Sequence, residues 1–232
     1  MLQPKFVKVK REIITTGDGS HSVSIPDMHV TYHSVHGAIQ ESMHVFIEAG
    51  LKNLPAQARL NIFEVGFGTG LNALLTIIAA EKLNTEIYYE TVEQFPLDGS
   101  ETRLLNYCKQ LDRGDLESVF ELLHDCEWEK KINVIENFSF KRSKTNLLNF
   151  ETSQTFELIY YDAFAPNVQP ELWTKEVFEK MIAMLRPGGI LVTYCSKGDV
   201  RRAMQAAAFV VEKLPGPKGK REMIRGTRLY EI

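Results

Sequence analysis

From Leu60 onward, short apolar stretches of strand length alternate with longer stretches whose apolar residues recur at helical spacing. The expected strands are 60–65, 86–92, 133–140, 156–161 and 190–195, and the expected helices are 71–83, 97–125, 171–185 and 200–208. Parallel strands need crossover connections, so this alternation predicts a doubly wound α/β fold with a parallel sheet covered on both faces. Two last strands, 209–214 and 223–232, are joined by the turn-rich Pro215-Gly216-Pro217-Lys218-Gly219, which predicts an antiparallel C-terminal hairpin.

The first part of the chain differs from this pattern. Residues 11–34 alternate polar and apolar positions around the turn signal Gly17-Asp18-Gly19-Ser20, which predicts a small β extension. Residues 37–54 have apolar side chains at helical spacing and end at Pro55. We therefore expect residues 1–55 to form a hairpin and helix packed on a core of residues 56–232, with the 232 residues making one structural domain overall.

Composition excludes several classes of protein. With 44% hydrophobic and 25% charged residues, the chain is neither disordered nor membrane-embedded, since no apolar stretch approaches the roughly 18 residues that span a bilayer. The segment Met1–Glu12 has no apolar region typical of a signal peptide, which predicts a cytoplasmic protein. The cysteines Cys108, Cys126 and Cys195 lie far apart and form no CxxC pair, so we expect no disulfide framework and no metal site.

A glycine-rich loop, Glu64-Val65-Gly66-Phe67-Gly68-Thr69-Gly70, joins the first core strand to its helix. Glycines let the backbone approach a ligand closely, although a tight turn alone can also require them. The spacing G-x-G-x-G differs from the G-x-G-x-x-G of dinucleotide sites, which disfavours an oxidoreductase. It resembles instead the first motif of class I S-adenosylmethionine-dependent methyltransferases, in which the acidic residue and the glycines hold the amino-acid end of the cofactor. Glu93 ends the second core strand, where a carboxylate can accept hydrogen bonds from ribose hydroxyls.

A second signature, Tyr160-Tyr161-Asp162-Ala163-Phe164-Ala165-Pro166, ends the fourth core strand. Ligands of open α/β sheets bind beside the point where the strand order reverses, so Asp162 is expected to face a ligand. The alternative is an aspartate that caps a helix or braces a loop. Pro166 and Pro170 restrict the loop, so Asp162 and Phe164 are expected to be held with little conformational freedom.

Charge is unevenly distributed along the chain. The net charge of −3 argues by itself against a nucleic-acid partner. Residues 197–228, however, contain nine basic and three acidic residues, a net charge of +6, while the rest contains 18 basic and 27 acidic residues, a net charge of −9. A basic C-terminal stretch is typical either of a phosphate-binding edge or of an ordinary solvated surface.

Four stretches together are similar to the methyltransferase part of the MnmC family of tRNA wobble-uridine modifying enzymes, in particular its stand-alone form, MnmD. They are Tyr32-His33-Ser34 with 41–46; 63–72; 162–166 with Trp173-Thr174; and Arg186-Pro187-Gly188-Gly189 through Arg201-Arg202 to Lys220-Arg221-Glu222-Met223. The family's flavin-dependent oxidase partner would need hundreds more residues. The resemblance therefore implies S-adenosylmethionine-dependent N-methylation of the 5-aminomethyl group of (2-thio)uridine at the wobble position, with other enzymes supplying that group.

The resemblance also implies roles for individual residues. Asp162 would face the substrate amine. The implied cofactor residues are Tyr32, Glu64, Gly66, Phe67, Gly68, Gly70, Asn72 and Glu93, with Asn146 at the adenine end, where the family usually has an acidic residue. The implied residues for the tRNA anticodon stem-loop are Phe164, Pro166, Arg201, Arg202, Lys220 and Arg221, with the basic side chains on phosphates and Phe164, Trp173 or Tyr32 stacking on the base. For Trp173, its place at the start of a helix favours a core or lid position over base stacking. The histidines 33, 36 and 44 are interpreted as surface or internally satisfied side chains.

Two alternatives from other classes stay open at this point. A methyltransferase acting on a small-molecule amine would keep the glycine loop and Asp162 but leave the basic stretch without a role. A non-catalytic RNA-binding protein on the same fold would have no affinity for S-adenosylmethionine. One further difference from the family is Ala208, where relatives tend to have glycine, and we expect it to be structural.

Overall fold

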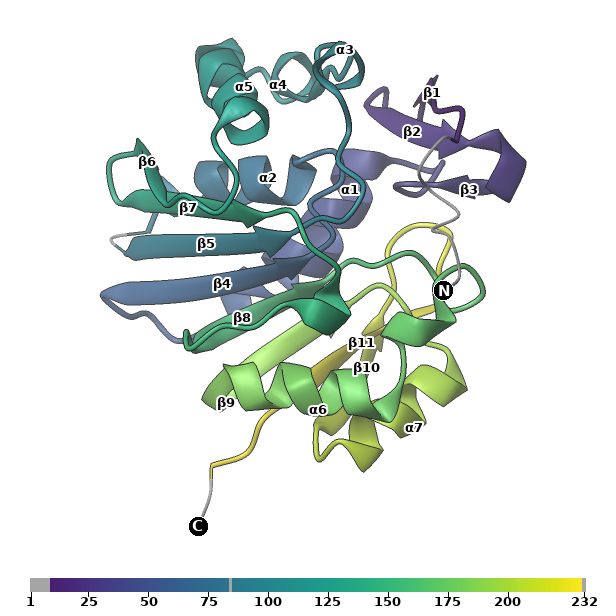
Figure 1. Cartoon of the computed structure of the whole chain (residues 1–232), viewed down its shortest axis with the longest axis vertical. Coiled ribbons are helices and arrows are strands. Elements are labelled where there is room, and N and C mark those ends of the chain that lie inside the picture. The colour runs from purple at the N-terminus through teal and green to yellow at the C-terminus, as the bar shows by residue number, and fades with distance from the viewer. Residues whose placement is uncertain (1–8, 84, 231–232) are drawn as a thin grey trace.

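The computed structural model describes residues 9–83 and 85–230. Residues 1–8 of the predicted N-terminal extension and residues 231 and 232 of the predicted last strand therefore lie outside the described residues. Its centre is an eight-stranded sheet of order β10-β11-β9-β8-β4-β5-β7-β6 (Figure 1). The strands are β4 (Arg59–Val65), β5 (Glu86–Val92), β6 (Ile132–Ile135), β7 (Phe138–Ser143), β8 (Phe156–Tyr161), β9 (Leu185–Thr193), β10 (Val210–Pro215) and β11 (Glu222–Thr227). Strands β4, β5, β7, β8 and β9 pair in parallel, whereas β6, β10 and β11 pair antiparallel. The predicted α/β class and the antiparallel C-terminal hairpin are therefore confirmed.

Helices cover both faces of this sheet because alternate strand residues point to opposite sides. Ile62 of β4 lies in one apolar cluster, together with the N-terminal helical segment and the helices that follow β4 and β5. The next residue, Phe63, points to the other face and lies in a second cluster, with the helices that precede and follow β9 in sequence. The helices are α1 (Ala38–Ser42), α2 (Leu71–Ala80), α3 (Gly99–Thr102), α4 (Tyr107–Gln110), α5 (Glu117–Asp125), α6 (Lys175–Met184) and α7 (Gly198–Ala206). Every residue of β8 is buried, as expected for a strand covered on both faces.

The N-terminal extension is a second, smaller sheet of β1 (Glu12–Thr15), β2 (His21–Ile25) and β3 (Val30–Thr31), all antiparallel. Figure 1 shows it beside the ends at which β4 and β5 finish. The carboxylate of Asp18, in the first turn, accepts a hydrogen bond from the backbone of Gln40 at 2.9 Å and so links the turn to α1. The helix continues from α1 as a π-helical segment, Met43–Glu48. Residues 32–34, directly after β3, therefore lie next to the carboxyl ends of β4, β5 and β8.

Several elements differ from the expectation in their bounds: the predicted helix 171–185 is Lys175–Met184, the predicted strand 190–195 is Leu185–Thr193, the predicted last strand 223–232 ends at Thr227, and the predicted helix 37–54 ends at Glu48.

Two stretches differ from the expectation in the number of elements. Residues 133–140 are not one strand but the hairpin of β6 and β7, because the chain reverses at Asn137, whose φ of 61° lies in the left-handed region that asparagine tolerates. The expected helix 97–125 is divided into α3, α4 and α5, and the capping box at Asp98 and Glu101 starts only the first of them. The three helices together form the connection from β5 to β6, so their division does not change the topology of the sheet.

Ala208, two residues after the end of α7, has a backbone conformation that glycine adopts more easily. Its φ is 68°, and its side chain is exposed. Replacing Ala208 with glycine should therefore raise the free energy of unfolding by about 0.5–1 kcal/mol, because the left-handed conformation strains a Cβ atom. Urea denaturation measures this change. The matched control is Ala206→Gly at the last residue of α7, where the backbone is still helical, so glycine should lower stability by up to about 1 kcal/mol. A destabilised Ala208→Gly protein would contradict the explanation.

Among the described residues, no helix has both the length and the apolar character needed to cross a bilayer.

Candidate functional site

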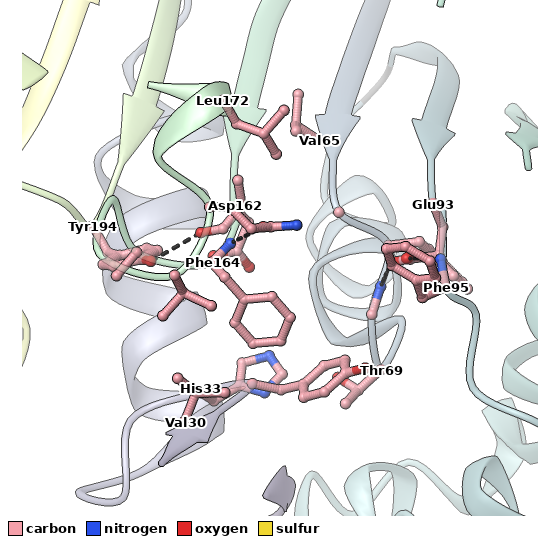
Figure 2. Close-up of a pocket in the computed structure, with 18 of the residues that line it drawn as sticks. Val30, His33, Val65, Thr69, Glu93, Phe95, Asp162, Phe164, Leu172 and Tyr194 are labelled. Atoms are coloured by element: carbon pink, nitrogen blue, oxygen red, sulfur yellow. Dashed lines mark hydrogen bonds between the residues drawn. The ribbon is translucent and has the colours of Figure 1, made fainter. Parts of the chain in front are cut away.

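A pocket of about 420 Å³ opens where the carboxyl ends of β4, β5 and β8 meet. The strand order reverses between β4 and β8, which is where open α/β sheets bind ligands. Figure 2 shows Asp162 and Phe164 in the middle of the pocket, with Tyr194 on one side and Glu93 and Phe95 on the other. Ten of the residues singled out from the sequence line it: Tyr32, Gly66, Phe67, Gly68, Asn72, Glu93, Asn146, Asp162, Phe164 and Lys220.

The glycine loop forms the floor of this pocket. Gly66, Gly68 and Gly70 have φ values of 87°, 51° and 73°, all in the left-handed region. A Cβ atom on Gly68 would lie 3.1 Å from the ring of Tyr32, and one on Gly66 would lie 2.9 Å from the carbonyl oxygen of Asp162. These glycines are therefore required by both backbone conformation and space, and they keep the loop open toward a ligand.

Glu93 lies at the carboxyl end of β5 and faces the glycine loop. Its two carboxylate oxygens accept hydrogen bonds from the backbone N–H of Gly68 at 3.0 Å and of Phe95 at 2.7 Å (Figure 2). The two N–H groups fix the orientation of the carboxylate, which still has lone pairs for further donors. A carboxylate held in this way fits a vicinal diol, as the sequence prediction for a ribose requires.

The amide of Asn72 joins two carboxyl groups at the centre of the site. Its Nδ2 donates to Glu64 at 3.0 Å and to Asp162 at 2.9 Å. Glu64 is fully buried, and burial, together with the charge of Asp162, raises its pKa well above the ordinary value. The Oδ1 atom of Asn72 is buried and accepts no hydrogen bond from the described residues. A cationic ligand with N–H donors, such as an α-ammonium group, fits this acceptor-rich corner.

Asp162 begins the loop after β8. Burial raises the pKa of its carboxyl group to about 7, and Glu41 adds to the rise, whereas the Asn72 hydrogen bond and the charge of Lys220 oppose it. The hydroxyl of Tyr194 donates to the carbonyl oxygen of Ala163 at 2.9 Å and so holds the loop in place (Figure 2). Asp162 can therefore exchange a proton with a bound group near neutral pH.

Aromatic rings form one wall of the pocket. The rings of Tyr32 and Phe164 meet edge to face with their centroids 5.1 Å apart. Trp173 belongs to the core, as its place at the start of a helix favours, because it is only 6% exposed and its indole N–H donates to the carbonyl of Phe164 at 2.8 Å. This hydrogen bond supports the loop after β8 and leaves Tyr32 and Phe164 as the candidates for base stacking.

Six predicted site residues do not line the pocket: Glu64, Gly70, Pro166, Arg201, Arg202 and Arg221. Glu64 and Gly70 lie directly behind its wall, since Glu64 contacts Asn72 and a Cβ on Gly70 would lie 3.0 Å from the ring of Phe67. Arg202 forms an ion pair with Asp199. Asn146 lines the pocket, but its Oδ1 accepts the backbone N–H of Leu148 at 2.8 Å, so one lone pair remains for a ligand.

Among the pocket residues that the sequence does not single out, His33 and Tyr194 bear most on the site. His33 is internally satisfied, as the sequence suggests, since its Nδ1 lies 3.5 Å from Oγ of Ser22, but it also lines the pocket, and burial lowers its pKa to about 4, so the ring is neutral at physiological pH. Tyr194 follows β9 directly and also lines the pocket. The position of Tyr194 at the carboxyl end of a parallel strand was a usable signal, whereas the burial of His33 depends on packing that sequence spacing does not reveal.

Within the described residues, no group of three or more histidine, cysteine, aspartate or glutamate side chains is arranged to hold a metal ion.

Comparison with known proteins supports the same kind of site. A model of the S-adenosyl-L-methionine-dependent methyltransferase family matches residues 126–229. The chain is 30% identical over 217 residues to the tRNA 5-methylaminomethyl-2-thiouridine biosynthesis bifunctional protein MnmC of Magnetococcus marinus, in an alignment that covers 85% of this chain and 31% of that protein. Over residues 126–229 the chain is similar to S-adenosyl-L-methionine-dependent methyltransferases, and over most of its length it is similar to MnmC. The chain spans about a third of the length of the curated relatives it matches.

Solved structures share the fold of this chain. MNMC2 from Aquifex aeolicus superposes with a TM-score of 0.77 at 23% identity, covering 98% of this chain and 74% of that chain. Spermidine synthase from Thermotoga maritima superposes with a TM-score of 0.55 at 13% identity, covering 96% of this chain and 69% of that chain. Both similarities agree with the doubly wound α/β fold predicted from the sequence.

Proposed function

We propose that this protein uses S-adenosylmethionine to methylate the 5-aminomethyl group of (2-thio)uridine at the wobble position of tRNA, giving the 5-methylaminomethyl form. The observation that carries the proposal is the carboxyl group of Asp162, which lies in a buried pocket with a pKa near 7, between an aromatic wall and the glycine loop. The name of the MnmC relatives supports the substrate. Other enzymes would supply the aminomethyl group, and we propose the cytoplasm as the location.

The chain offers a matching set of groups for the cofactor. Glu93 would accept the ribose hydroxyls, and Glu64 with Asn72 would receive the α-ammonium group at the buried acceptor corner. S-Adenosylmethionine supplies the electrophilic methyl group when it is bound. The remaining work of the protein is to hold the amine nitrogen in line, within about 3–3.5 Å of that carbon, and to exclude water.

Asp162 would capture and orient the amine. A primary alkylamine is mostly protonated at neutral pH, and an ammonium has no lone pair for attack, so a proton must leave first. The Asp162 carboxylate can accept a charge-assisted hydrogen bond from the amine, and its raised pKa also makes it a competent proton acceptor near pH 7. Loss of the proton to water remains the other route, with Asp162 limited to orientation.

The tRNA anticodon stem-loop is the proposed macromolecular partner. The wobble base would leave its stack and enter beside Phe164 and Tyr32, whose rings already form a wall. The hydrogen bond from Lys213 lowers the pKa of Glu222, and the charges of Arg221 and Arg201 add to this effect, so these basic side chains lie on one part of the surface. Phosphates are the expected partners of these side chains. Arg202 is the weaker candidate, since Asp199 already neutralises it.

The decisive experiment incubates the purified protein with labelled S-adenosylmethionine and tRNA from cells lacking this final step. Mass spectrometry of the digested tRNA should then detect the 5-methylaminomethyl nucleoside. Two results would favour the alternatives. Substrate binding that ignores moderate salt would favour a small-molecule amine, and absence of S-adenosylmethionine binding by calorimetry would favour a non-catalytic RNA-binding protein.

The pH dependence of the reaction provides a further prediction. Because the raised pKa of Asp162 is about 7, its carboxylate becomes protonated as pH falls through 7, and kcat/KM should fall with it. At higher pH, kcat/KM should rise further, because a larger fraction of the substrate amine is then unprotonated. In Asp162→Asn, whose rate is much lower at every pH, the profile of kcat/KM from about pH 5 to pH 9 should lack the limb near 7 and keep the limb of the amine. An unchanged limb in that variant would contradict the assignment.

A further inference from the structure

Lys220 lies in the turn between β10 and β11, and the surrounding structure directs its side chain into the pocket. Its ammonium nitrogen is 2.6 Å from Oε1 of Glu41 in α1 and 3.9 Å from the centre of the Tyr194 ring. The other carboxylate oxygen of Glu41 accepts the backbone N–H of Ser34 at 2.7 Å. The Glu41 side chain is only 9% exposed, so this ion pair is formed at a partly dehydrated site rather than in open solvent.

The turn that carries Lys220 is held against the N-terminal segment by two other contacts. His44 hydrogen bonds through Nε2 to the carbonyl oxygen of Pro215 at 2.8 Å. Gly219, with a φ of 87°, lies so close to His36 that a Cβ atom there would be 2.2 Å from the ring. The position of the Lys220 ammonium is therefore fixed by its neighbours, and this side chain is a poor candidate for the phosphate contact inferred from the sequence.

An ammonium has three N–H donors, and the described residues provide Lys220 with one hydrogen-bond acceptor, Glu41. The π face of Tyr194 favours the charge but leaves donor capacity available for a ligand. Lys220 also lowers the pKa of Asp162, so the two charges lie near each other in the pocket. The same wall thus offers a hydrogen-bond acceptor, Asp162, and a hydrogen-bond donor, Lys220, to one ligand.

The proposed substrate carries the complementary pair. In 5-aminomethyluracil the amine is attached through one carbon to C5, and the neighbouring ring carbon, C4, carries a carbonyl oxygen. We propose that Lys220 is a specificity-determining residue that donates a hydrogen bond to this carbonyl oxygen while Asp162 holds the amine. The inference rests on the proposed function. The positive charge of Lys220 also disfavours the ammonium form of the nearby amine, which helps to expose the lone pair.

The test compares steady-state kinetics of methyl transfer to aminomethyl-bearing tRNA in the unchanged protein and in Lys220→Met. Removing the donor should raise KM for tRNA about tenfold or more, while affinity for S-adenosylmethionine, measured by calorimetry, stays within about twofold. Lys220→Arg should recover part of the loss. Because Lys220→Met leaves Glu41 unpaired, the double variant Glu41→Gln/Lys220→Met removes both charges and should give the same rise in KM.

Two controls separate base recognition from other roles of Lys220. His44→Ala removes the hydrogen bond to the carbonyl of Pro215 but keeps the Lys220 ammonium, so the KM for tRNA should stay near that of the unchanged protein. Arg221→Met should reduce the salt dependence of tRNA binding by about one phosphate contact, whereas Lys220→Met should leave that slope unchanged. A raised KM in His44→Ala equal to that of Lys220→Met, or a reduced salt slope in Lys220→Met, would overturn the inference.

The outcome for the unchanged protein distinguishes the two proposals. If it does not methylate the tRNA, the proposed function and the role of Lys220 both fail. If it methylates the tRNA and the double variant keeps the same KM, only the role of Lys220 fails.

Discussion

Replacing Asp162 with alanine should lower kcat for methyl transfer about 10³-fold, with a modest loss of cofactor affinity. The side chain is one of two carboxyl groups held by Asn72, and it is the one that lines the pocket. Without it, the substrate amine has no carboxylate to hold its nitrogen in line or to accept its proton. Turnover is measured with labelled cofactor and tRNA, and cofactor affinity is measured by calorimetry. Near-normal turnover would contradict the role of Asp162.

Asp162→Asn is the matched variant, since it keeps the size of the side chain but removes the charge. It should lose turnover nearly as fully as the alanine variant. Its stability provides an independent check: the pKa of Asp162 is raised in the folded protein, so folding favours the protonated form, and the unfolding free energy falls as pH rises from about 4 to about 7. Asp162→Asn should therefore be more stable than the unchanged protein at pH 8. A loss of turnover in a more stable protein cannot come from unfolding.

The parts of the fold that depend on local pattern were predictable. The bounds of β5 and β8 agree with the expected strands, because apolar strands in a parallel sheet are marked by composition and by the turns that flank them. Glu64 to Gly70 was recognised because a strand, a glycine turn and a helix follow one another directly in sequence. The division of 133–140 into two strands depended on a single left-handed residue, Asn137, which leaves no trace in hydrophobic periodicity.

The parts of the site that depend on distant contacts were not predictable. Lys220 and Glu41 are 179 residues apart in sequence, and only the packing of the last hairpin against the N-terminal helical segment brings them together. In the sequence Lys220 is one of several basic residues near the C-terminus, whereas in the structure it lines the pocket. The burial of Trp173 also follows from the path of the loop after β8, although its place at the start of a helix already favours a core position. Sequence thus identified the pocket groups that lie at strand ends, but not the distant groups that complete the pocket wall.

Gly66→Ala should be the most damaging single substitution in the glycine loop, the proposed cofactor site. The new Cβ would lie 2.9 Å from the backbone oxygen of Asp162, and the φ of 87° strains any side chain. Because the contact is with backbone, a side-chain rotation cannot relieve it, and we expect a loss of about 2–4 kcal/mol in unfolding free energy. Cofactor affinity should fall about 100-fold, because the glycine loop must shift to relieve the contact. Urea denaturation and calorimetry measure the two effects.

The control for this substitution is Gly114→Ala, since nothing lies within 4 Å of the added Cβ atom and the residue does not line the pocket. That variant should keep both stability and cofactor affinity close to those of the unchanged protein. The backbone oxygen that a Gly66 side chain would strike belongs to Asp162 itself, so Gly66→Ala should weaken cofactor binding and turnover together. Asp162→Ala, in contrast, should reduce turnover while affecting cofactor binding only modestly. Normal cofactor affinity in Gly66→Ala would mean that the cofactor is not held by this loop.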